Sequence, residues 1–319
     1  MRAVRVLAGR AGRALLVLFG ISVLVFLIFF ATPGADPAAR LAGRGAAPQT
    51  LAQVRAEYGL DQPMPVQYAA LMRRLFVTRD LPSFVNRGQL VVPAVLRATP
   101  VTVALVVGSV TLWLAAGLLI ALATAWAGPR MGRAVVALGL LGVSIPAFWL
   151  GSMVTLVAEG PLHATAFAWV PPLGMPPEGV WGWVRTLALP WLTLAVLYAG
   201  IYGRILGHGL QAELRQDYVR TARAKGLGEA RVALRHALPN AAIPALALLG
   251  LDVGALLGGG TVLVEVVFGL HGIGQLTYDA LLSLDLAMVM ACVLYAAVFV
   301  VLANGAMELA QAALDPRAR

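Results

Sequence analysis

The chain contains six apolar runs that are each long enough to cross a lipid bilayer, at about 20 residues per crossing. They lie near Ala14–Ala31, Pro100–Ala127, Ala134–Val157, Leu187–Leu206, Ile243–Val264 and Ala287–Leu309. Of the 319 residues, 60% are hydrophobic and only 12% are charged, whereas soluble domains carry about 25% charged residues. One aqueous core cannot bury this much apolar surface, so the sequence predicts an all-α integral membrane protein with six transmembrane helices.

The first apolar run has two interpretations. Four arginines precede it, which is also typical of a secretory signal peptide. Its apolar core runs from Ala14 to Phe30, which is longer than the roughly 7–15 residues of a signal peptide core. We therefore interpret it as a retained transmembrane helix.

The distribution of arginines predicts the orientation in the membrane, because cytoplasmic loops are enriched in Lys and Arg. The amino terminus, the loop with Arg130 and Arg133, the segment from Arg204 to Arg235, and the tail are all basic and alternate correctly. The segment between the first two spans also carries arginines, but long translocated segments largely escape this rule. We expect both termini in the cytoplasm, and we attribute the net charge of +9 to orientation and not to nucleic-acid binding.

The most polar interruption of the apolar pattern is DYVRTARAKGLGEARVALRHALPN, from Asp217 to Asn240. Tyr218, Ala222 and Lys225 share one face of a helix, because they are spaced as i, i+4 and i+7. A basic surface at this position could contact anionic lipid headgroups. The alternative is a docking surface for another protein.

Glycines divide this segment into two parts. Gly226 and Gly228 are expected to end the first helix. A second short helix can run from Glu229 to about Leu238, and Pro239 can begin the next one. The sequence therefore predicts a helix, a break and a second helix at the cytoplasmic surface.

At this point the residues resemble a known family. Asp217 to Gly226 is similar to the EAA loop of ATP-binding-cassette importer permeases, in the version typical of dipeptide and oligopeptide permeases. Of the triplet Arg220-Thr221-Ala222, only the alanine matches the general Glu-Ala-Ala form, while Gly226 and Leu238-Pro239 match the rest. Further similar segments are Thr32–Pro37, Gly59–Tyr68, Gly142–Phe148, Val264–Phe268, Gly272–Gly274 and Leu314–Arg317. The resemblance is to the first of two paired permeases.

The resemblance implies a type I importer fold and a set of partners. These are a homologous second permease, two cytoplasmic ATP-binding-cassette ATPase subunits, an extracytoplasmic substrate-binding protein and membrane lipid, with no nucleic acid. The chain itself has no GxxxxGK[ST] phosphate loop, and its single lysine, Lys225, lies in the cytoplasmic loop. We therefore expect no cofactor or metal on this chain and no enzyme activity, with ATP and Mg used by the partner ATPases.

The resemblance also implies a domain organisation. Residues 1–31 form an N-terminal cytoplasmic stub and the first transmembrane helix, and residues 32–97 form an extracytoplasmic cap domain. Residues 98–310 form the core permease domain with five transmembrane helices, including the coupling loop 213–240, and residues 311–319 form a cytoplasmic tail.

The coupling loop is expected to carry most of the contacts to an ATPase. Tyr218 and Ala222 would pack in a groove of the ATPase, and the basic side chains would make polar contacts. Gly226 would allow the sharp break, and Pro239 would fix the start of the fifth span. The full set of expected coupling residues is Asp217, Tyr218, Arg220, Thr221, Ala222, Arg223, Lys225, Gly226, Leu238 and Pro239.

Three residues are candidates for the translocation pathway. Asp252 lies about midway along the fifth span, where a carboxylate is unfavourable unless it faces water or a partner. It is either protonated or internally hydrogen-bonded at the interface with the paired permease, or it lines the pathway and meets a substrate amine. Glu265 either lines the outer gate or forms an interface hydrogen bond. Pro146 lies within the third span and is expected to kink it.

Several other functions fit the sequence less well. A secondary transporter working alone predicts inverted repeats and paired ionisable residues in the spans, and an intramembrane enzyme needs a catalytic constellation that the sequence lacks. A structural scaffold whose basic loop only touches lipid would tolerate a bulky residue at Gly226. Within the importer family, nickel or another small solute is an alternative to short peptides. The expected location is the inner or plasma membrane of a prokaryote.

Overall fold

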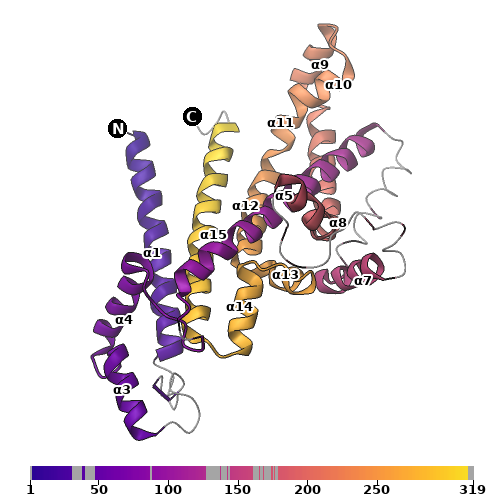
Figure 1. Ribbon diagram of the computed structural model, residues 1–319. Coiled ribbons are helices and arrows are strands. Elements are labelled where there is room, and N and C mark those ends of the chain that lie inside the picture. Colours follow the sequence, from indigo (N-terminus) through magenta and orange to yellow (C-terminus); the bar gives the residue numbers. More distant parts are fainter. Residues whose placement is uncertain are drawn as a thin grey trace. The chain divides into compact units, whose positions relative to one another are not determined.

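The chain is almost entirely helical in the part that the structure describes. The computed structural model describes residues 2–30, 38–39, 47–86, 88–126, 137, 142, 144–160, 165, 168, 174, 176 and 179–314. Within these ranges the regular elements are helices (Figure 1), together with an isolated antiparallel bridge between Pro82 and Leu90. Helices satisfy their own backbone hydrogen bonds, which a bilayer requires. The predicted all-α fold class is confirmed.

The chain divides into two compact units, which we describe one at a time. The first comprises Met1–Pro100 and Gly272–Val301, and the second comprises Val101–His271 and Leu302–Arg319. The first unit holds α1 (Arg2–Phe30), α3 (Pro48–Tyr58), α4 (Met64–Arg73), the π-helical turn η1 (Arg74–Thr78), α14 (Ile273–Leu282), the start of α5 (Val91–Trp126) and half of α15 (Leu286–Leu314). The second unit holds α7 (Ala147–Glu159), α8 (Val180–Glu213), α9 (Asp217–Ala224), α10 (Glu229–Val232), η2 (Ala233–Ala237), α11 (Leu238–Ala241), α12 (Ile243–Ala255), η3 (Leu256–Gly260), α13 (Val262–Val267) and the remainder of α5 and α15.

Five helical segments in the described ranges are long and apolar enough to cross a membrane. They are Gly12–Phe30, Val91–Trp126, Val180–Glu213, Ile243–Gly260 and Leu286–Leu309. They correspond to five of the six predicted spans. The carboxyl-terminal part of the remaining predicted span forms α7, an apolar helix of 13 residues. Most of residues 134–143 lie outside the described residues, so the count of six remains a prediction.

Several of these helices extend beyond the expected spans, and α5 and α8 also contain prolines. The helix α5 begins at Val91 and contains Pro100, the predicted start of the span. The helix α8 runs from Val180 to Glu213 and contains Pro190. The predicted limits followed apolar content alone, whereas backbone hydrogen bonding continues into polar turns, and proline is tolerated in membrane helices.

The expectation that Pro146 kinks a helix is wrong. Pro146 is the residue that immediately precedes α7, and its backbone is extended, with φ −61° and ψ 133°. Proline has no N–H to contribute to a helix, and it restricts the residue before it to extended conformations. Both effects suit a helix start, so Pro146 begins α7 and does not bend a continuous span.

In the first unit, the cap segment packs against α1. The hydroxyl groups of Ser22 on α1 and Tyr68 on α4 lie 2.6 Å apart and share a hydrogen bond. The ring of Tyr68 also meets Phe26 edge to face, with ring centroids 5.5 Å apart. The described part of the predicted cap is thus mainly helical and packs against α1, while its status as a separate domain and its placement outside the membrane remain predictions.

A buried carboxylate joins this segment to α15. Asp285 is 3% exposed and accepts hydrogen bonds from the hydroxyl of Ser83 and the backbone N–H of Phe84, the latter at 3.2 Å. Its Oδ1 atom also accepts a 3.2 Å hydrogen bond from the backbone N–H of Met288 in the first turn of α15. One side chain therefore caps a helix and fixes a loop about 200 residues away in the sequence.

We expect Asp285→Ala to lower the free energy of unfolding by about 3 kcal/mol, because it removes the buried carboxylate that accepts hydrogen bonds from the Ser83 hydroxyl and from two backbone N–H groups. The measurement is the unfolding midpoint of the purified chain in detergent. Asp279→Ala is the matched control, because Asp279 is an exposed carboxylate on the neighbouring helix α14. Equal midpoints for the two variants would contradict the anchoring role of Asp285.

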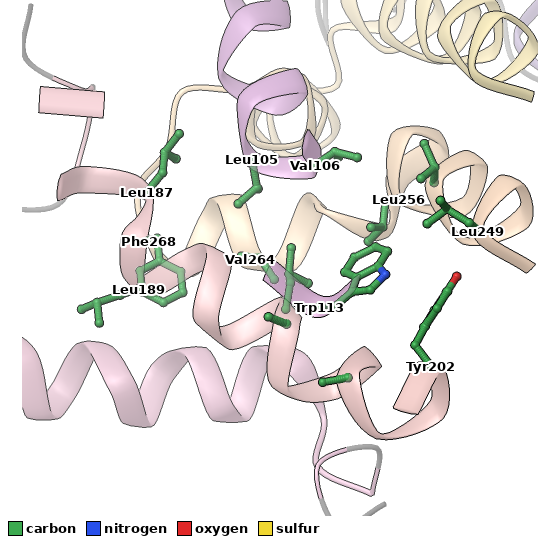
Figure 2. Close-up of a cluster of buried hydrophobic side chains, with 14 of the residues drawn as sticks. Leu105, Val106, Trp113, Leu187, Leu189, Tyr202, Leu249, Leu256, Val264 and Phe268 are labelled. Atoms are coloured by element: carbon green, nitrogen blue, oxygen red, sulfur yellow. The ribbon is translucent and has the colours of Figure 1, made fainter. Parts of the chain in front are cut away.

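The second unit is built around an apolar core contributed by several helices. Its labelled members in Figure 2 are Leu105, Val106, Trp113, Leu187, Leu189, Tyr202, Leu249, Leu256, Val264 and Phe268. They come from α5, α8, α12, η3 and α13, with Phe268 directly after α13. Residues that are far apart in the sequence thus meet in one packed cluster.

Small residues let α5 and α8 approach closely. A Cβ added to Gly108 would come within 2.1 Å of the Trp191 ring, and one added to Gly203 within 2.4 Å of Ile120. The Trp191 indole N–H donates a 2.9 Å hydrogen bond to the backbone oxygen of Ala104. Close backbone approach at small residues is how helices associate in membranes, where the hydrophobic effect between them is weak.

Candidate functional site

The coupling loop follows α8 and forms the predicted helix, break and helix. The first helix, α9, spans Asp217–Ala224, and Gly226 then adopts a left-handed backbone with φ 79°. Gly228 precedes α10, which begins at Glu229 and continues through the π-helical turn η2. Pro239 lies in the first turn of α11, as expected for a residue that begins a helix. The predicted local structure is confirmed.

The loop has a small apolar core of its own. Val219 and Val232 are fully buried and Ala222 is 7% exposed, with Leu214 and Leu227 packed against them. The two short helices therefore hold each other through these side chains. Ala222 faces this core, so its side chain is not on the exposed face with Tyr218 and Lys225, and its expected contact with an ATPase groove is replaced by packing inside the loop.

An ion pair closes the loop across the glycine break. The guanidinium of Arg223 donates two hydrogen bonds to the carboxylate of Glu229, at 2.7 and 3.0 Å. It donates a third, of 3.3 Å, to the backbone oxygen of Leu214. The hydrogen bond between them raises the pKa of Arg223 and lowers the pKa of Glu229. Arg223 therefore orders the loop, in addition to any contact with a partner.

Tyr218 connects α9 to both neighbouring segments. Its hydroxyl donates a 2.5 Å hydrogen bond to Glu213 at the end of α8 and accepts one of 3.2 Å from the Asn240 side chain in α11. Partial burial of the hydroxyl raises the pKa of Tyr218, and the bond to Glu213 acts in the same direction. The tyrosine fixes the angle at which the loop leaves the membrane helices.

Sequence reasoning did not identify Glu213, Glu229 and Asn240 as part of the site. Each is an internal partner of a predicted residue, and no spacing rule relates Glu213 to Asn240 across 27 positions. The reach of Arg223 to Glu229 depends on the left-handed turn between them. Opposite charges on either side of the two glycines were the available signal for that pair.

The remaining polar groups of the loop point outward. Arg220 and Asp217 form a 3.3 Å ion pair, but both side chains are largely exposed, so it contributes little stability. The hydroxyl of Thr221 donates to the backbone oxygen of Asp217 at 3.1 Å. Lys225 is exposed at the tip of the loop, and further exposed cations are Arg231 and Arg235. The loop thus presents a basic outer surface on an internally ordered base.

The end of the predicted segment serves mainly to join the loop to the membrane helices. Leu238 packs with Leu210 of α8 and with Ala237 and Ala241. Pro239 remains exposed at the start of α11. These residues hold the base of the loop against α8, and Leu214 at the end of α8 packs against both this cluster and the apolar core of the loop.

The two pathway carboxylates have different surroundings. Asp252 on α12 is partly exposed and accepts a 2.7 Å hydrogen bond from the hydroxyl of Tyr202 on α8. Glu265 is fully buried and accepts hydrogen bonds from Thr102 at 2.8 Å and Thr261 at 3.1 Å. Glu265 is therefore buried and bonded within its own chain, whereas Asp252 combines an internal bond with access from outside the core.

No group of three or more His, Cys, Asp or Glu side chains that could hold a metal ion occurs in the ranges that the structure covers. The predicted family segments at residues 32–37 and 315–317 lie outside the described residues. The described part of the chain is therefore a helical membrane bundle with an ordered basic loop and a partly exposed carboxylate, Asp252, about midway along a span.

Comparison with known proteins places nearly the whole chain in one group. A family model described as "Binding-protein-dependent transport system inner membrane component" matches residues 113–319. The model for the N-terminal part of the same membrane components matches residues 3–106. The two matches do not overlap, and together they include the coupling loop and the five candidate spans apart from residues 107–112.

Individual relatives agree with the family models. The chain is 34% identical to a peptide transport system permease protein of Brucella abortus (strain 2308), over 97% of each chain. It is 33% identical to the D,D-dipeptide transport system permease protein DdpB of Escherichia coli (strain K12), covering 98% of this chain and 96% of the relative. It is also 34% identical to the glutathione transport system permease protein GsiC of Salmonella choleraesuis (strain SC-B67), over 94% of each chain.

A solved structure shares the fold. A chain of the MetNI methionine ABC transporter, in an inward-facing conformation, is similar over 70% of this chain and 96% of that chain, with a TM-score of 0.53. The sequence identity is 18%, so this likeness concerns the fold alone. It agrees with the helical importer architecture that the sequence predicted.

Proposed function

Because the chain belongs to the family of binding-protein-dependent transport system inner membrane components, we propose that it is the permease subunit of an ATP-binding-cassette importer for short peptides. It forms half of the translocation pathway and couples that pathway to ATP hydrolysis in separate subunits. The substrate class is supported by relatives that are named for transport of peptides, D,D-dipeptides and glutathione.

The observation that carries the coupling role is the internal order of the loop Asp217–Asn240. Its own apolar core, the Arg223–Glu229 pair and the Tyr218 contacts hold it in one shape. A segment that only touches lipid headgroups has no need of a fixed shape, whereas force transmission from a partner needs one. The exposed groups on this base, mainly Arg220 and Lys225, then make polar contacts to an ATPase.

The proposed partners follow from this role. They are a homologous second permease, two cytoplasmic ATP-binding-cassette ATPases that use ATP and Mg, an extracytoplasmic substrate-binding protein and membrane lipid. The family is one of membrane transport components, so this chain contributes the pathway and the coupling surface, and hydrolysis takes place in the ATPases. Both termini and the coupling loop lie in the cytoplasm, on the arginine distribution described above.

The test is gentle purification of the tagged chain from its native membrane, with identification of the co-purifying proteins by mass spectrometry. We expect a second permease and one or two ATPases. Lys225→Glu should reduce ATPase recovery severalfold, because it reverses the charge at the exposed tip of the loop. Arg97→Glu is the control, because it reverses an exposed charge on α5, at the edge of the predicted cap and away from the loop.

Recovery of the chain alone, or as a homo-oligomer without any ATPase, would overturn the importer assignment. Equal loss of the ATPase in both charge variants would instead show that the loop tip has no special role in docking. A co-purifying binding protein would allow its bound ligand to be identified directly, and a ligand other than a peptide would correct the substrate class.

A further inference from the structure

Asp252 has one hydrogen-bond partner and no countercharge in the described part of the chain. The hydroxyl of Tyr202 donates to its Oδ2 atom at 2.7 Å, and no described Arg, Lys or His forms an ion pair with it. Asp252 is partly exposed, while Tyr202 is fully buried behind it. An ionised carboxylate at this depth in a span is unfavourable by several kcal/mol unless a partner compensates for it. The carboxylate is thus hydrogen-bonded on the side that faces the core and accessible on the opposite side.

Aromatic rings surround the partner of this carboxylate. Tyr198 and Tyr202 are four residues apart on α8, so they share a face of the helix. The ring of Trp113 from α5 stacks on Tyr198, with centroids 4.5 Å apart, and lies 5.9 Å from the ring of Tyr202 (Figure 2 shows Trp113 next to Tyr202). Tyr198 is partly exposed, as Asp252 is. A carboxylate near aromatic rings is a combination that attracts organic cations, because the carboxylate and the ring faces both carry negative potential.

The same cluster contains an unsatisfied polar group. The indole N–H of Trp113 is buried and has no hydrogen-bond acceptor among the described residues. Buried polar groups in native proteins are nearly always paired, and each exception calls for an explanation, such as a functional role or a bound water. The cluster therefore differs from an ordinary apolar packing layer, both in its charge and in its unpaired donor.

We propose that Asp252, positioned by Tyr202 and flanked by Tyr198, binds the protonated amino group of the transported solute as it crosses the membrane. This proposal rests on the function proposed above and adds a specificity determinant to it. The amino terminus of a free peptide has a pKa of about 7.7–8.0 and is largely protonated at neutral pH. A bound metal ion fits the site poorly, because Ca²⁺ and Mg²⁺ require several oxygen ligands and no group of three acidic, His or Cys side chains occurs in the described ranges.

The first experiment measures ligand access to Asp252 directly. The purified complex, without its binding protein, is treated with a hydrophobic carbodiimide, and modified carboxylates are located by peptide mapping. We expect Asp252 to react and millimolar Ala-Ala to slow its modification, whereas N-acetyl-Ala-Ala does not. The buried Asp285 is the internal control, because its reactivity should not respond to either peptide.

The second experiment measures transport by the complete complex in proteoliposomes supplied with binding protein, with labelled Ala-Ala as the probe. Asp252→Asn keeps an oxygen acceptor for Tyr202 and removes the charge, so we expect ATP-driven uptake to fall roughly tenfold or more. Leu251→Asn is the matched control, because it places the same amide on the adjacent, exposed position of α12. Its uptake should stay close to that of the wild type.

The outcomes separate the two proposals. Equal protection by both peptides, no protection by either, or no modification of Asp252 at all would each overturn the amine site. Unchanged Ala-Ala uptake by Asp252→Asn would do the same and leave the importer function intact. If the wild-type complex with its binding protein imports no peptide, the proposed function fails, and the amine site fails with it.

Discussion

Gly108→Ala is expected to lower the free energy of unfolding by about 3 kcal/mol, the upper part of the range for overpacking a tight interior. The new Cβ would lie 2.1 Å from the Trp191 ring, well inside van der Waals contact. The ring cannot move away easily, because its N–H is bonded to the backbone oxygen of Ala104. The measurement is the thermal unfolding midpoint of the purified chain in detergent, together with the yield of folded protein.

Two further variants make this prediction specific. Gly20→Ala is the control, because a Cβ at that position on α1 meets no atom within 4 Å. Trp191→Leu in the Gly108→Ala background should restore part of the lost stability, since it removes the ring that the methyl group meets. If the two mutations act independently, the stability loss of the double mutant equals the sum of the losses of the single mutants. A double mutant with that full loss would refute the proposed contact.

Gly226→Val is expected to abolish most ATP-driven uptake while the membrane helices remain folded. Gly226 has φ 79°, a conformation that costs a residue with a Cβ about 1–2 kcal/mol and is least tolerated by β-branched side chains. No atom lies within 4 Å of the added Cβ, so the effect comes from the backbone. A shift at this turn separates Arg223 from Glu229 and opens the Val219–Val232 contact. The measurement is uptake by the complete complex in proteoliposomes.

Gly228→Val is the matched control for this variant. Gly228 also has open space around its Cβ position, but its backbone is extended, with φ −65° and ψ 148°, which valine adopts readily. We expect its uptake to stay near the wild-type level. Full uptake by Gly226→Val would favour a loop that only touches lipid, and equal losses in both variants would point to side-chain bulk instead of backbone conformation.

Much of the candidate site could be predicted from local sequence, because its determinants are local. The break at Gly226 follows from the preference of glycine for positive φ, and the helix start at Pro239 follows from the missing proline N–H. The family match likewise agrees with the resemblance drawn from the stretch that includes Lys225. Periodicity placed Tyr218 and Ala222 on one helix face, but it could not tell that Ala222 packs against Val232 inside the loop.

The errors came where local patterns meet tertiary contacts. Pro146 lies in an apolar run, so composition placed it inside a span, whereas the backbone is extended there and α7 begins after it. For Glu265 the sequence left an outer gate and an interface hydrogen bond open; its contacts with Thr102 and Thr261 add that the side chain is buried and bonded within its own chain, and its role stays a prediction. A hydropathy profile describes apolar content along the chain. It does not show which hydroxyl group, distant in sequence, lies within hydrogen-bonding distance of a carboxylate.

By itself, the sequence determined that the chain is an all-helical membrane protein with an ordered, glycine-broken basic loop, because apolar length, arginine distribution and glycine conformation act locally. Only the tertiary structure decided which polar groups inside the bundle are satisfied. Asp252 lies in the fifth predicted span and Glu265 directly after it. Glu265 is buried and hydrogen-bonded to two threonines, whereas Asp252 is partly exposed and hydrogen-bonded to one tyrosine. That difference arises from helix packing between distant segments, in which Gly117 of α5 lies directly against Tyr202 of α8, and the Tyr202 ring lies beside Trp113.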